Sequence, residues 1–271
     1  MASTSAYRAK QPGPDGRIRF DAGEDAVWRD LMARQMPLVG RCMAPPWLEG
    51  LARLDLPRDR VAQPVEVSAR LMELTGWQVA PVPAVIGFGR FFDMLARKVF
   101  PAASFIRSRE DFDYVKEPDI FHEIFGHAPL LTDPRFAAFS QAIGRAGVAA
   151  DPGDHVWLIR AYWFTIEFGL TRIDGEIRAL GAGLASSPGE LVASLEDSEA
   201  ERRAFDLIDL LRTPYRIDIH QPIYYVLEDL DVLFDLAERD LSADVARARA
   251  LGLFAPTYPV EAGKRGEGGG K

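Results

Sequence analysis

Apolar side chains recur at helical spacing along much of the chain. Between Glu24 and Met36 they occupy positions 27, 28, 31, 32 and 36, which is the spacing of one buried helix face. Pro37 is expected to end this helix, because an interior proline removes a hydrogen bond and clashes with the preceding turn. Similar patterns, bounded by Gly and Pro, predict further helices over residues 65–74, 91–100, 134–146, 156–168, 188–195, 200–211, 229–238 and 243–251.

One segment alternates with a period of two instead. Asp174 and Gly175 separate two short alternating stretches, 171–173 and 176–178, which is a strong local signal for a β-hairpin. Residues 215–219 and 223–227 are expected to form further short strands. The fold class predicted is therefore mostly α, with a small peripheral β-sheet or hairpin.

The two ends of the chain lack this periodicity. Residues 1–20 are polar and rich in Pro and Gly, which predicts a flexible segment, and residues 259–271 read as a disordered Gly-rich tail. No linker-like stretch or internal repeat interrupts the part between them. A single domain is therefore expected over residues 21–258.

Composition narrows the class of protein. The 271 residues are 48% hydrophobic and 27% charged, which is typical of a globular protein. The formal net charge of -8 argues against nucleic acid as a partner, and no window of about 18 apolar residues predicts a membrane span. The N-terminus has no apolar signal-peptide stretch, and Cys42 is the only cysteine. A reducing cytoplasm is therefore the expected location.

Two histidines suggest a metal site. His122 and His127 lie five residues apart, in a segment where Pro118 and Asp119 favour the start of a helix. In the His-Glu-x-x-His motif of zinc proteases the histidines are four apart and share a helix face. A spacing of five rotates the second ring by about 140° on an unbroken α-helix. If the helix ends at Gly126, His127 can turn back and both imidazoles can bind one metal.

Glu167 is the candidate for a third ligand. It is the only charged residue between Arg160 and Arg172, in a segment rich in aromatic and aliphatic side chains. A buried carboxylate is costly unless it is paired or bound to metal. Two histidines and one carboxylate form the facial triad of non-haem Fe(II) oxygenases. Ordinary capping or core histidines, and an ion pair from Glu167 to Arg160 or Arg172, are the alternatives.

Four blocks of sequence resemble one known family. Residues 117–130, EPDIFHEIFGHAPL, look like the signature of the pterin-dependent aromatic amino acid hydroxylases. Residues 162–170, YWFTIEFGL, and 181–187, GAGLASS, are similar to two further family blocks, and 75–82, TGWQVAPV, resembles one upstream. The blocks occur in the family's order, and the resemblance extends over roughly residues 25–240.

The resemblance implies the catalytic domain of this family over residues 21–258. It implies a monooxygenase that uses Fe(II), O₂ and a tetrahydropterin, either tetrahydrobiopterin or a bacterial analogue, to hydroxylate an aromatic amino acid on its ring. By position in the motifs, His122, His127 and Glu167 match the iron ligands. The pterin-side and catalytic positions match Val85, Ile86, Phe91, Glu123 and Tyr162, with Glu123 as the catalytic candidate.

The resemblance also implies a substrate site. Arg107 matches the arginine that holds the substrate carboxylate, and Asp119 is placed to orient it. The remaining substrate-side candidates match positions that line the pocket or support the ligands: Tyr114, Pro118, Trp163, Phe168, Gly183 and Ser186. Outside the motif context, the aromatic side chains among them would be ordinary core residues and Arg107 a surface arginine.

Differences from the animal members of the family narrow the expected subgroup and substrate. The chain has Val115-Lys116 where animal members often have Thr-Pro, and it has neither a long N-terminal extension nor a heptad run at its end. It resembles the short bacterial members, which implies conversion of L-phenylalanine to L-tyrosine. The lack of a heptad run and the net charge of -8 predict a monomer. The alternatives are tryptophan or tyrosine as substrate within the family, a zinc hydrolase, and a non-catalytic sensor of amino acid or metal.

Overall fold

The computed structural model describes residues 7–83 and 86–258. Val85 and the tail at 259–271 therefore lie outside the described residues. The described part is mostly helical, which confirms the predicted fold class. Its α-helices are α1 (Ala22–Cys42), α2 (Pro45–Leu54), α3 (Pro64–Thr75), α4 (Phe88–Ala96), α5 (Pro134–Ala149), α6 (His155–Tyr162), α7 (Ala182–Ser186), α8 (Pro188–Glu196), α9 (Leu207–Arg212), α10 (Asp231–Asp235) and α11 (Leu241–Leu251).

Short helical turns and strands complete the domain. Two turns are π-helical, η1 (His122–His127) and η4 (Trp163–Glu167), and three are 3₁₀ turns, η2 (Leu130–Thr132), η3 (Pro152–Asp154) and η5 (Leu236–Glu238). The strands are β1 (Gln78–Val82), β2 (Val99–Ala103), β3 (Leu170–Ile173), β4 (Glu176–Ala179), β5 (Glu201–Ala204) and β6 (Ile223–Leu227).

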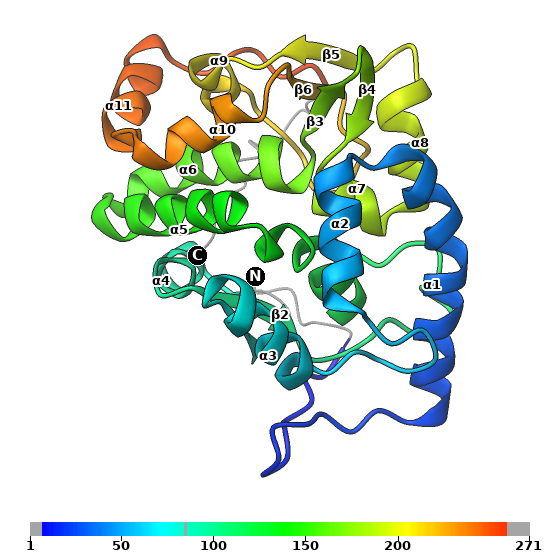
Figure 1. Ribbon diagram of the computed structural model, residues 1–271. Helices are drawn as coiled ribbons and strands as arrows, with labels where there is room; N and C mark the ends of the chain where they lie inside the picture. The colour runs from blue at the N-terminus through cyan, green and yellow to red at the C-terminus, as the bar shows by residue number, and fades with distance from the viewer. Residues whose placement is uncertain (1–6, 84–85, 259–271) are drawn as a thin grey trace, which may run out of the picture.

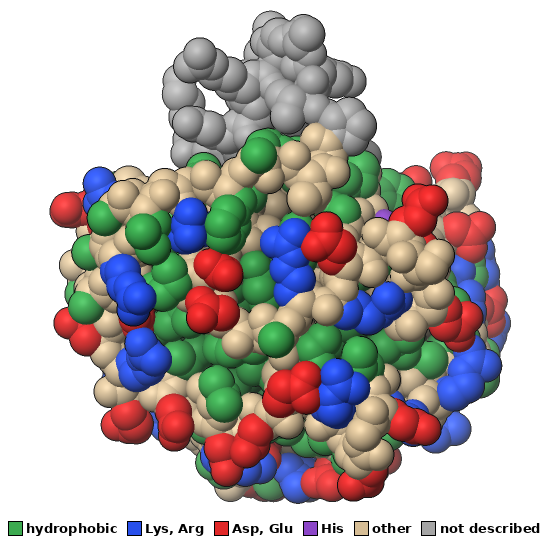
Figure 2. Space-filling view, turned by 90° about the horizontal axis from the view of Figure 1, so that it is seen from above, with side chains coloured by type: hydrophobic (Ala, Val, Ile, Leu, Met, Phe, Trp, Pro, Cys, Tyr) green, Lys and Arg blue, Asp and Glu red, His purple; other side chains and the backbone are tan. Residues whose placement is uncertain are grey.

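The helices form the body of the molecule, and the strands lie at its edges (Figure 1). Helices α5 and α6 run across the middle, α4 packs against α5, and the long α1 flanks one side. Strands β1 and β2 form a parallel pair, while the other four form a sheet in the order β4-β3-β6-β5. On the face shown in Figure 2, side chains of both charges are interspersed among apolar ones.

The predicted hairpin is confirmed. Strands β3 and β4 are antiparallel, and the turn between them places Asp174 at φ 50° and Gly175 at φ 85°. Two successive positive φ angles define the tight turn that Asp-Gly favours. The strand predicted at 223–227 is also present, as β6, in the interior of the four-stranded sheet.

Three helix predictions were wrong at their ends, and one of these helices, expected over 134–146, runs past Gly147 to Ala149 as α5. Helix α1 does not stop at Pro37 but continues to Cys42, because Val39 and Cys42 are buried in the core and their burial offsets the cost of the proline. The helix expected over 91–100 ends at Ala96, and Phe100 lies in β2. Parallel pairing of β2 with β1 determines this segment, and pairing across the chain leaves no mark on local periodicity.

Two further predictions were wrong in type. Within the helix expected over 200–211, residues Glu201–Ala204 form edge strand β5, and only Leu207–Arg212 are helical. Pairing of β5 with β6 overrides the helical pattern there. The strand expected over 215–219 is absent, since the Gln221 amide donates to the carbonyls of Arg216 and Ile219 and holds this segment in a turn.

The described part of the N-terminal segment lies against the domain. Ile18 is buried, and its N–H donates to Gln63 Oε1 at 2.8 Å. Lys10 N–H donates to the carbonyl of Ser104 at 3.2 Å. These contacts place residues 7–20 against the domain, although this part of the chain contains no helix or strand.

Candidate active site

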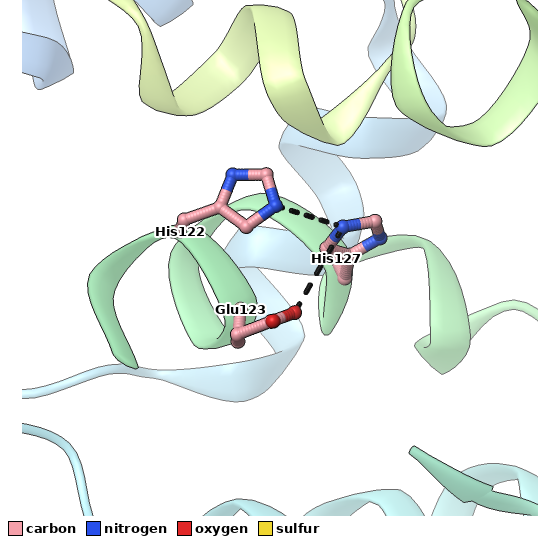
Figure 3. Close-up of side chains that lie close together, drawn as sticks. All are labelled: His122, Glu123 and His127. Atoms are coloured by element: carbon pink, nitrogen blue, oxygen red, sulfur yellow. Dashed lines mark hydrogen bonds and ion pairs between the residues drawn. The ribbon is translucent and has the colours of Figure 1, made fainter. Parts of the chain in front are cut away.

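The two candidate histidines face each other across a π-helical turn. His122 and His127 begin and end η1, and their Nε2 atoms lie 3.2 Å apart. Hydrogen bonds in a π-helix run between residues five apart, so the wider turn brings these positions together. The expectation that the helix ends at Gly126 was therefore wrong. The two imidazoles nevertheless point toward each other, as was expected for a shared metal ion (Figure 3).

Gly126 serves close packing instead of ending a helix. A Cβ atom at this position would lie 2.7 Å from the carbonyl oxygen of Ala182 in α7, nearer than real Cβ contacts allow. The Gly126 carbonyl accepts a hydrogen bond from Trp47 Nε1 at 3.0 Å. The π-helical turn is thus held from α2 on one side and α7 on the other.

A cluster of buried aromatic rings supports the same turn. Phe121 and Phe125 stack at 4.7 Å within this segment. Trp28 of α1 packs edge-on against Phe121, and Trp47 of α2 packs edge-on against Phe125, each at 5.3 Å. Such pairs add to the area that the rings bury. The first two helices therefore act as a rigid base for the histidines.

Glu167 joins the histidines from a second π-helical turn. It is the last residue of η4, and its carboxylate oxygens lie 2.9 Å from His127 Nε2 and 3.4 Å from His122 Nε2. It is paired with neither arginine that could have neutralised it. Arg172 pairs with Glu228, and Arg160 donates to the carbonyl of Leu211.

The outer nitrogen of each imidazole also has a partner. His122 Nδ1 lies 2.8 Å from Ser186 Oγ, and His127 Nδ1 lies 3.2 Å from the Tyr162 hydroxyl. When Nδ1 carries the proton and donates it to these oxygens, Nε2 is left with a free lone pair. Both lone pairs are then directed toward the Glu167 carboxylate.

Gly183 leaves room for that carboxylate. A Cβ atom at position 183 would lie 2.7 Å from Glu167 Oε1 and 2.8 Å from the Phe168 ring. Any larger side chain would displace the carboxylate or the ring. Among the sequence candidates, Gly183 and Ser186 of α7 therefore support the ligand set directly.

The pKa values of the two neighbouring carboxyl groups, Glu123 and Glu167, are shifted in opposite directions. Desolvation raises the pKa of Glu123 well above its ordinary value, and the charges of Glu167 and Asp119 raise it further. Desolvation acts in the same direction on Glu167, but the imidazoles of His127 and His122 outweigh it and lower the pKa of that carboxyl. Desolvation lowers the pKa of His122 to about 4, which leaves its ring neutral at neutral pH.

The donor set fits a single divalent metal ion. Glu123 is also near the histidines, since the ligand atoms of His122, Glu123 and His127 lie within 4.8 Å of one another. Its carboxylate is, however, 4.0 Å from His127 Nε2, whereas Glu167 approaches both rings more closely. Two imidazoles and one carboxylate match the facial triad of non-haem iron oxygenases.

Three of the described pterin-side candidates, Phe91, Glu123 and Tyr162, lie next to this cluster. Phe91 of α4 packs edge-on against Tyr162 at 5.4 Å, and Tyr162 contacts His127. Ile86 is half-buried just before α4. Phe91, Tyr162 and Glu123 come from α4, α6 and η1, so three separate segments meet beside the two histidines.

The substrate-side arginine forms a buried ion pair. Arg107 is 5% exposed, and its Nε and Nη2 donate to the two oxygens of Asp119 at 2.8 and 2.9 Å. Desolvation would lower the pKa of Arg107, but the Asp119 charge outweighs it and raises the pKa instead. Asp119 Oδ1 also accepts the backbone N–H of His122 at 3.0 Å. One carboxylate therefore links the arginine to the π-helical turn.

Aromatic rings surround Trp163 beside Glu167. Its ring lies 4.6 Å from Phe168 and 4.3 Å from Tyr215, and its Nε1 donates to Gln221 Oε1 at 3.1 Å. Sequence analysis named Trp163 and Phe168 but missed Tyr215 and Gln221. A buried indole N–H needs an acceptor, so the sequence could indicate that a partner exists, but not which residue it is.

Two substrate-side candidates differ from the others in exposure. Tyr114 is 62% exposed in the loop that follows Arg107, and Pro118 is half-buried just before Asp119. Tyr114 therefore differs in exposure from the buried pair Arg107 and Asp119 and from the partly buried Trp163.

Comparison with known proteins places this site in a family. The family described as biopterin-dependent aromatic amino acid hydroxylase matches residues 1–245. The chain is 48% identical over 252 residues to the phenylalanine-4-hydroxylase of Vibrio cholerae, covering 93% of this chain and 87% of that protein. It is also 48% identical over 256 residues to that of Pseudomonas aeruginosa, covering 94% and 97%.

A solved structure agrees in fold. The apo cold-active phenylalanine hydroxylase from Colwellia psychrerythraea superposes with a TM-score of 0.91 at 47% identity, covering 94% of this chain and 99% of that one. The fold and site thus define a mononuclear non-haem metal oxygenase. The chain belongs to the biopterin-dependent aromatic amino acid hydroxylases and is a pterin-dependent monooxygenase. Its cofactors are Fe(II) and a tetrahydropterin, with O₂ as co-substrate.

No helix within residues 7–83 and 86–258 is both long and apolar enough to cross a membrane.

Proposed function

We propose that this protein hydroxylates L-phenylalanine to L-tyrosine. Support comes from relatives at 48% identity over more than nine-tenths of the chain, both named as phenylalanine-4-hydroxylases. The site contributes an arginine for the amino acid carboxylate and aromatic walls suited to an aromatic ring. The alternatives of a zinc hydrolase or a sensor lose their basis, because the five-residue histidine spacing and the family both favour oxygenase chemistry.

His122, His127 and Glu167 hold the iron in this proposal. The observation that carries the assignment is the approach of their ligand atoms to within 2.9–3.4 Å of one another, with both outer imidazole nitrogens bonded. Ser186 and Tyr162 fix the orientation of the rings, and Gly183 leaves space for the carboxylate. The bound iron and tetrahydropterin supply the activation of O₂ and the two electrons that the reaction needs.

Arg107 binds the substrate carboxylate. Its Nε and Nη2 are bonded to Asp119, and among the described residues no hydrogen bond engages Nη1. A planar guanidinium suits a carboxylate, and Asp119 keeps that plane fixed. Trp163 and Phe168 form the wall for the aromatic ring and exclude water from the reacting carbon. Pro118 and Tyr114 lie at the edge of the proposed substrate site.

The pterin occupies the side of the cluster formed by Ile86, Phe91, Glu123 and Tyr162. Phe91 offers a ring face, and the Glu123 carboxyl is the candidate for proton transfer to or from the cofactor. Val85, which belongs to the same stretch by resemblance, lies outside the described residues. This placement is supported by the contact of Phe91 with Tyr162 and of Tyr162 with His127.

One experiment tests the function. Purified protein is loaded with Fe(II) and assayed for pterin-dependent oxygen uptake with phenylalanine, tyrosine and tryptophan, and the products are identified. We expect iron-dependent tyrosine formation, with phenylalanine giving the highest kcat/KM. Hydrolase activity with zinc and no pterin-dependent uptake would contradict the proposal, and preferential turnover of tryptophan would move it to another substrate.

We also propose a cytoplasmic monomer whose catalytic domain covers residues 21–258. The net charge of -8 disfavours self-association, and the buried, unpaired Cys42 suits a reducing compartment. Sedimentation velocity at micromolar concentration is expected to give a single species of about the mass of one chain. A stable tetramer would contradict this.

A further inference from the structure

The N-terminal segment reaches the backbone on both sides of Arg107. The Tyr7 ring stacks on Phe105 with 4.6 Å between centroids and 7° between planes. The Tyr7 hydroxyl accepts the backbone N–H of Ser108 at 3.1 Å and donates to the carboxylate of Asp111. These contacts involve the residue two before Arg107 and the residue immediately after it.

The opposite side of the same segment is held by the residues that lead into the metal site. Asp119 accepts the backbone N–H of Arg107 at 3.0 Å, and Ile120 N–H donates to the carbonyl of Phe105 at 2.8 Å. Residues 105–108 therefore lie between Tyr7 on one side and residues 119–120 on the other. Phe105 is 3% exposed, so the Tyr7 ring covers a side chain that is otherwise part of the core.

Tyr7 is joined to the rest of the domain by its own segment. Lys10 N–H donates to the Ser104 carbonyl, and the Lys10 ammonium forms an ion pair with Glu24 of α1. The ring of Tyr7 is thus placed by contacts on either side of residues 104–108 and not by a helix or strand. A segment that composition marks as flexible contributes to the geometry of a buried arginine.

We propose that Tyr7 is a positioning residue for substrate binding. By fixing Phe105 and Ser108 it sets the direction in which the Arg107 guanidinium meets the carboxylate of the amino acid. Asp119 fixes the plane of the guanidinium, whereas Tyr7 fixes the backbone from which the side chain extends. This inference rests on the proposed role of Arg107.

The loop after Arg107 depends on the same contact. Asp111 N–H donates to Ser108 Oγ, and the Asp111 carboxylate accepts from Tyr7, so the hydroxyl ties the start of residues 108–114 to the N-terminal segment. Further along, α1 holds the loop through Arg34, which pairs with Asp113 at 2.8 Å. Loss of the Tyr7 contact would free the end of the loop next to Arg107 and leave the far end in place.

The test compares Tyr7→Leu, Tyr7→Phe and a control, Arg8→Ala. Leucine keeps apolar cover over Phe105 but removes the flat ring and the hydroxyl, so the domain should still fold. Because a small displacement of a binding group weakens productive binding, we expect Tyr7→Leu to raise KM for phenylalanine by about tenfold. Its kcat, its KM for tetrahydropterin and its iron content should stay near those of the unmodified protein.

The other variants identify the cause. Tyr7→Phe keeps the stacked ring but loses the hydroxyl contacts with Ser108 and Asp111, so its KM for phenylalanine is expected to lie between those of Tyr7→Leu and the unmodified protein. Arg8 is exposed in the same segment, and Arg8→Ala is expected to change nothing. An unaltered KM for phenylalanine in Tyr7→Leu overturns the inference. Equal rises in KM for phenylalanine and tetrahydropterin also overturn it, because they indicate general damage.

A parallel variant separates this inference from the function that it rests on. Arg107→Lys keeps a positive charge beside Asp119 but lacks the planar fork. If its KM for phenylalanine is unchanged, the proposed role of Arg107 fails. If that KM rises while Tyr7→Leu behaves as the unmodified protein, only the positioning role of Tyr7 fails.

Discussion

Two buried carboxylates, Asp119 and Glu167, differ in what compensates the cost of their buried negative charge. Asp119 is fully buried and forms two side-chain hydrogen bonds with Arg107, so its charge is balanced within the chain. Glu167 is also buried, but it faces the imidazoles of His122 and His127 and has no arginine or lysine partner among the described residues. The first arrangement is complete as it stands, while the second is completed by a metal cation.

The difference indicates that the Arg107–Asp119 pair stabilises the fold, whereas the cluster around Glu167 is arranged to bind a metal ion. A balanced buried pair is strongly destabilised when one partner is removed. An unbalanced donor set instead gains stability from its ligand. Asp119 connects the two, because it also accepts the backbone N–H of His122. Variants at the two carboxylates should therefore differ in whether they affect metal content or folding.

The largest expected effect is on metal binding. Glu167→Ala is expected to fold but to lose iron and measurable hydroxylation, because removing a direct ligand should exceed the roughly 10–100-fold loss of affinity typical of outer-shell changes. Metal analysis of the purified protein, with circular dichroism to confirm folding, is the measurement. Glu123→Gln is the matched control, since Glu123 is 4.0 Å from His127 Nε2, and this variant should keep its iron. Full iron content in Glu167→Ala would exclude Glu167 as a ligand.

The next effect is on folding. Asp119→Ala leaves Arg107 as an uncompensated buried charge and is expected to lower the free energy of unfolding by about 3–5 kcal/mol. Denaturant unfolding of the metal-free protein measures this without a contribution from iron. A double variant, Arg107→Leu with Asp119→Leu, should recover much of the stability, because neither charge remains buried. An Asp119→Ala protein as stable as the unmodified one would show that the pair is not structural.

Part of this contrast could be predicted from the sequence. The motif around His122 and the isolated charge of Glu167 indicated the ligand set, and Asp174-Gly175 indicated the hairpin, because each signal lies in a few neighbouring residues. The π-helical turn could not be predicted, since it depends on Trp47 and Ala182, which approach Gly126 from distant helices. Gly126 therefore resembled a helix stop.

The supporting residues were missed for a related reason. Tyr7 and Gln221 lie in segments without a motif or periodicity, and Tyr215 lies where a strand was expected. The contacts of these residues with Phe105 and Trp163 exist only in the folded chain. The strand β5 was hidden in the same way, because its pairing with β6 outweighs a local helical pattern. The sequence therefore indicated the ionisable side chains of the site more readily than the residues that position them.

Substrate capture should respond to Arg107 without a change in iron. Arg107→Ala is expected to lower kcat/KM for phenylalanine by about 10²-fold, because the substrate carboxylate is left unpaired in a water-poor site. Arg107→Lys tests whether charge alone is sufficient, since lysine cannot reproduce the planar fork. Steady-state kinetics together with metal analysis give the result. Normal kinetics in both variants would remove Arg107 from the substrate site and leave its pair with Asp119 purely structural.

A third buried carboxyl, Glu190, has no basic partner within residues 7–83 and 86–258 and is not part of the metal-ligand cluster. It accepts hydrogen bonds from the Gln221 N–H at 2.8 Å and the Tyr224 hydroxyl at 3.2 Å. Desolvation raises its pKa from 4.5 to about 7, because these two neutral donors do not offset burial, and the negative charge of Glu167 adds to the rise. Protonation is thus a third way to keep a carboxyl group in the interior.

The smallest expected effect is on the pH dependence of the free energy of unfolding, through the proton bound by Glu190. The folded protein keeps it up to a pH near 7, whereas the unfolded chain releases it near 4.5. Folding therefore binds a proton between these values, and the contribution of Glu190 to stability falls as the pH rises through this window. The free energy of unfolding should drop by about 2 kcal/mol between about pH 5.5 and about pH 7.5 relative to Glu190→Gln, whose amide keeps the size of the side chain but does not titrate. Denaturant unfolding of both proteins across this range measures the difference. Parallel curves would mean that Glu190 is ionised in the fold and that some other group balances its charge.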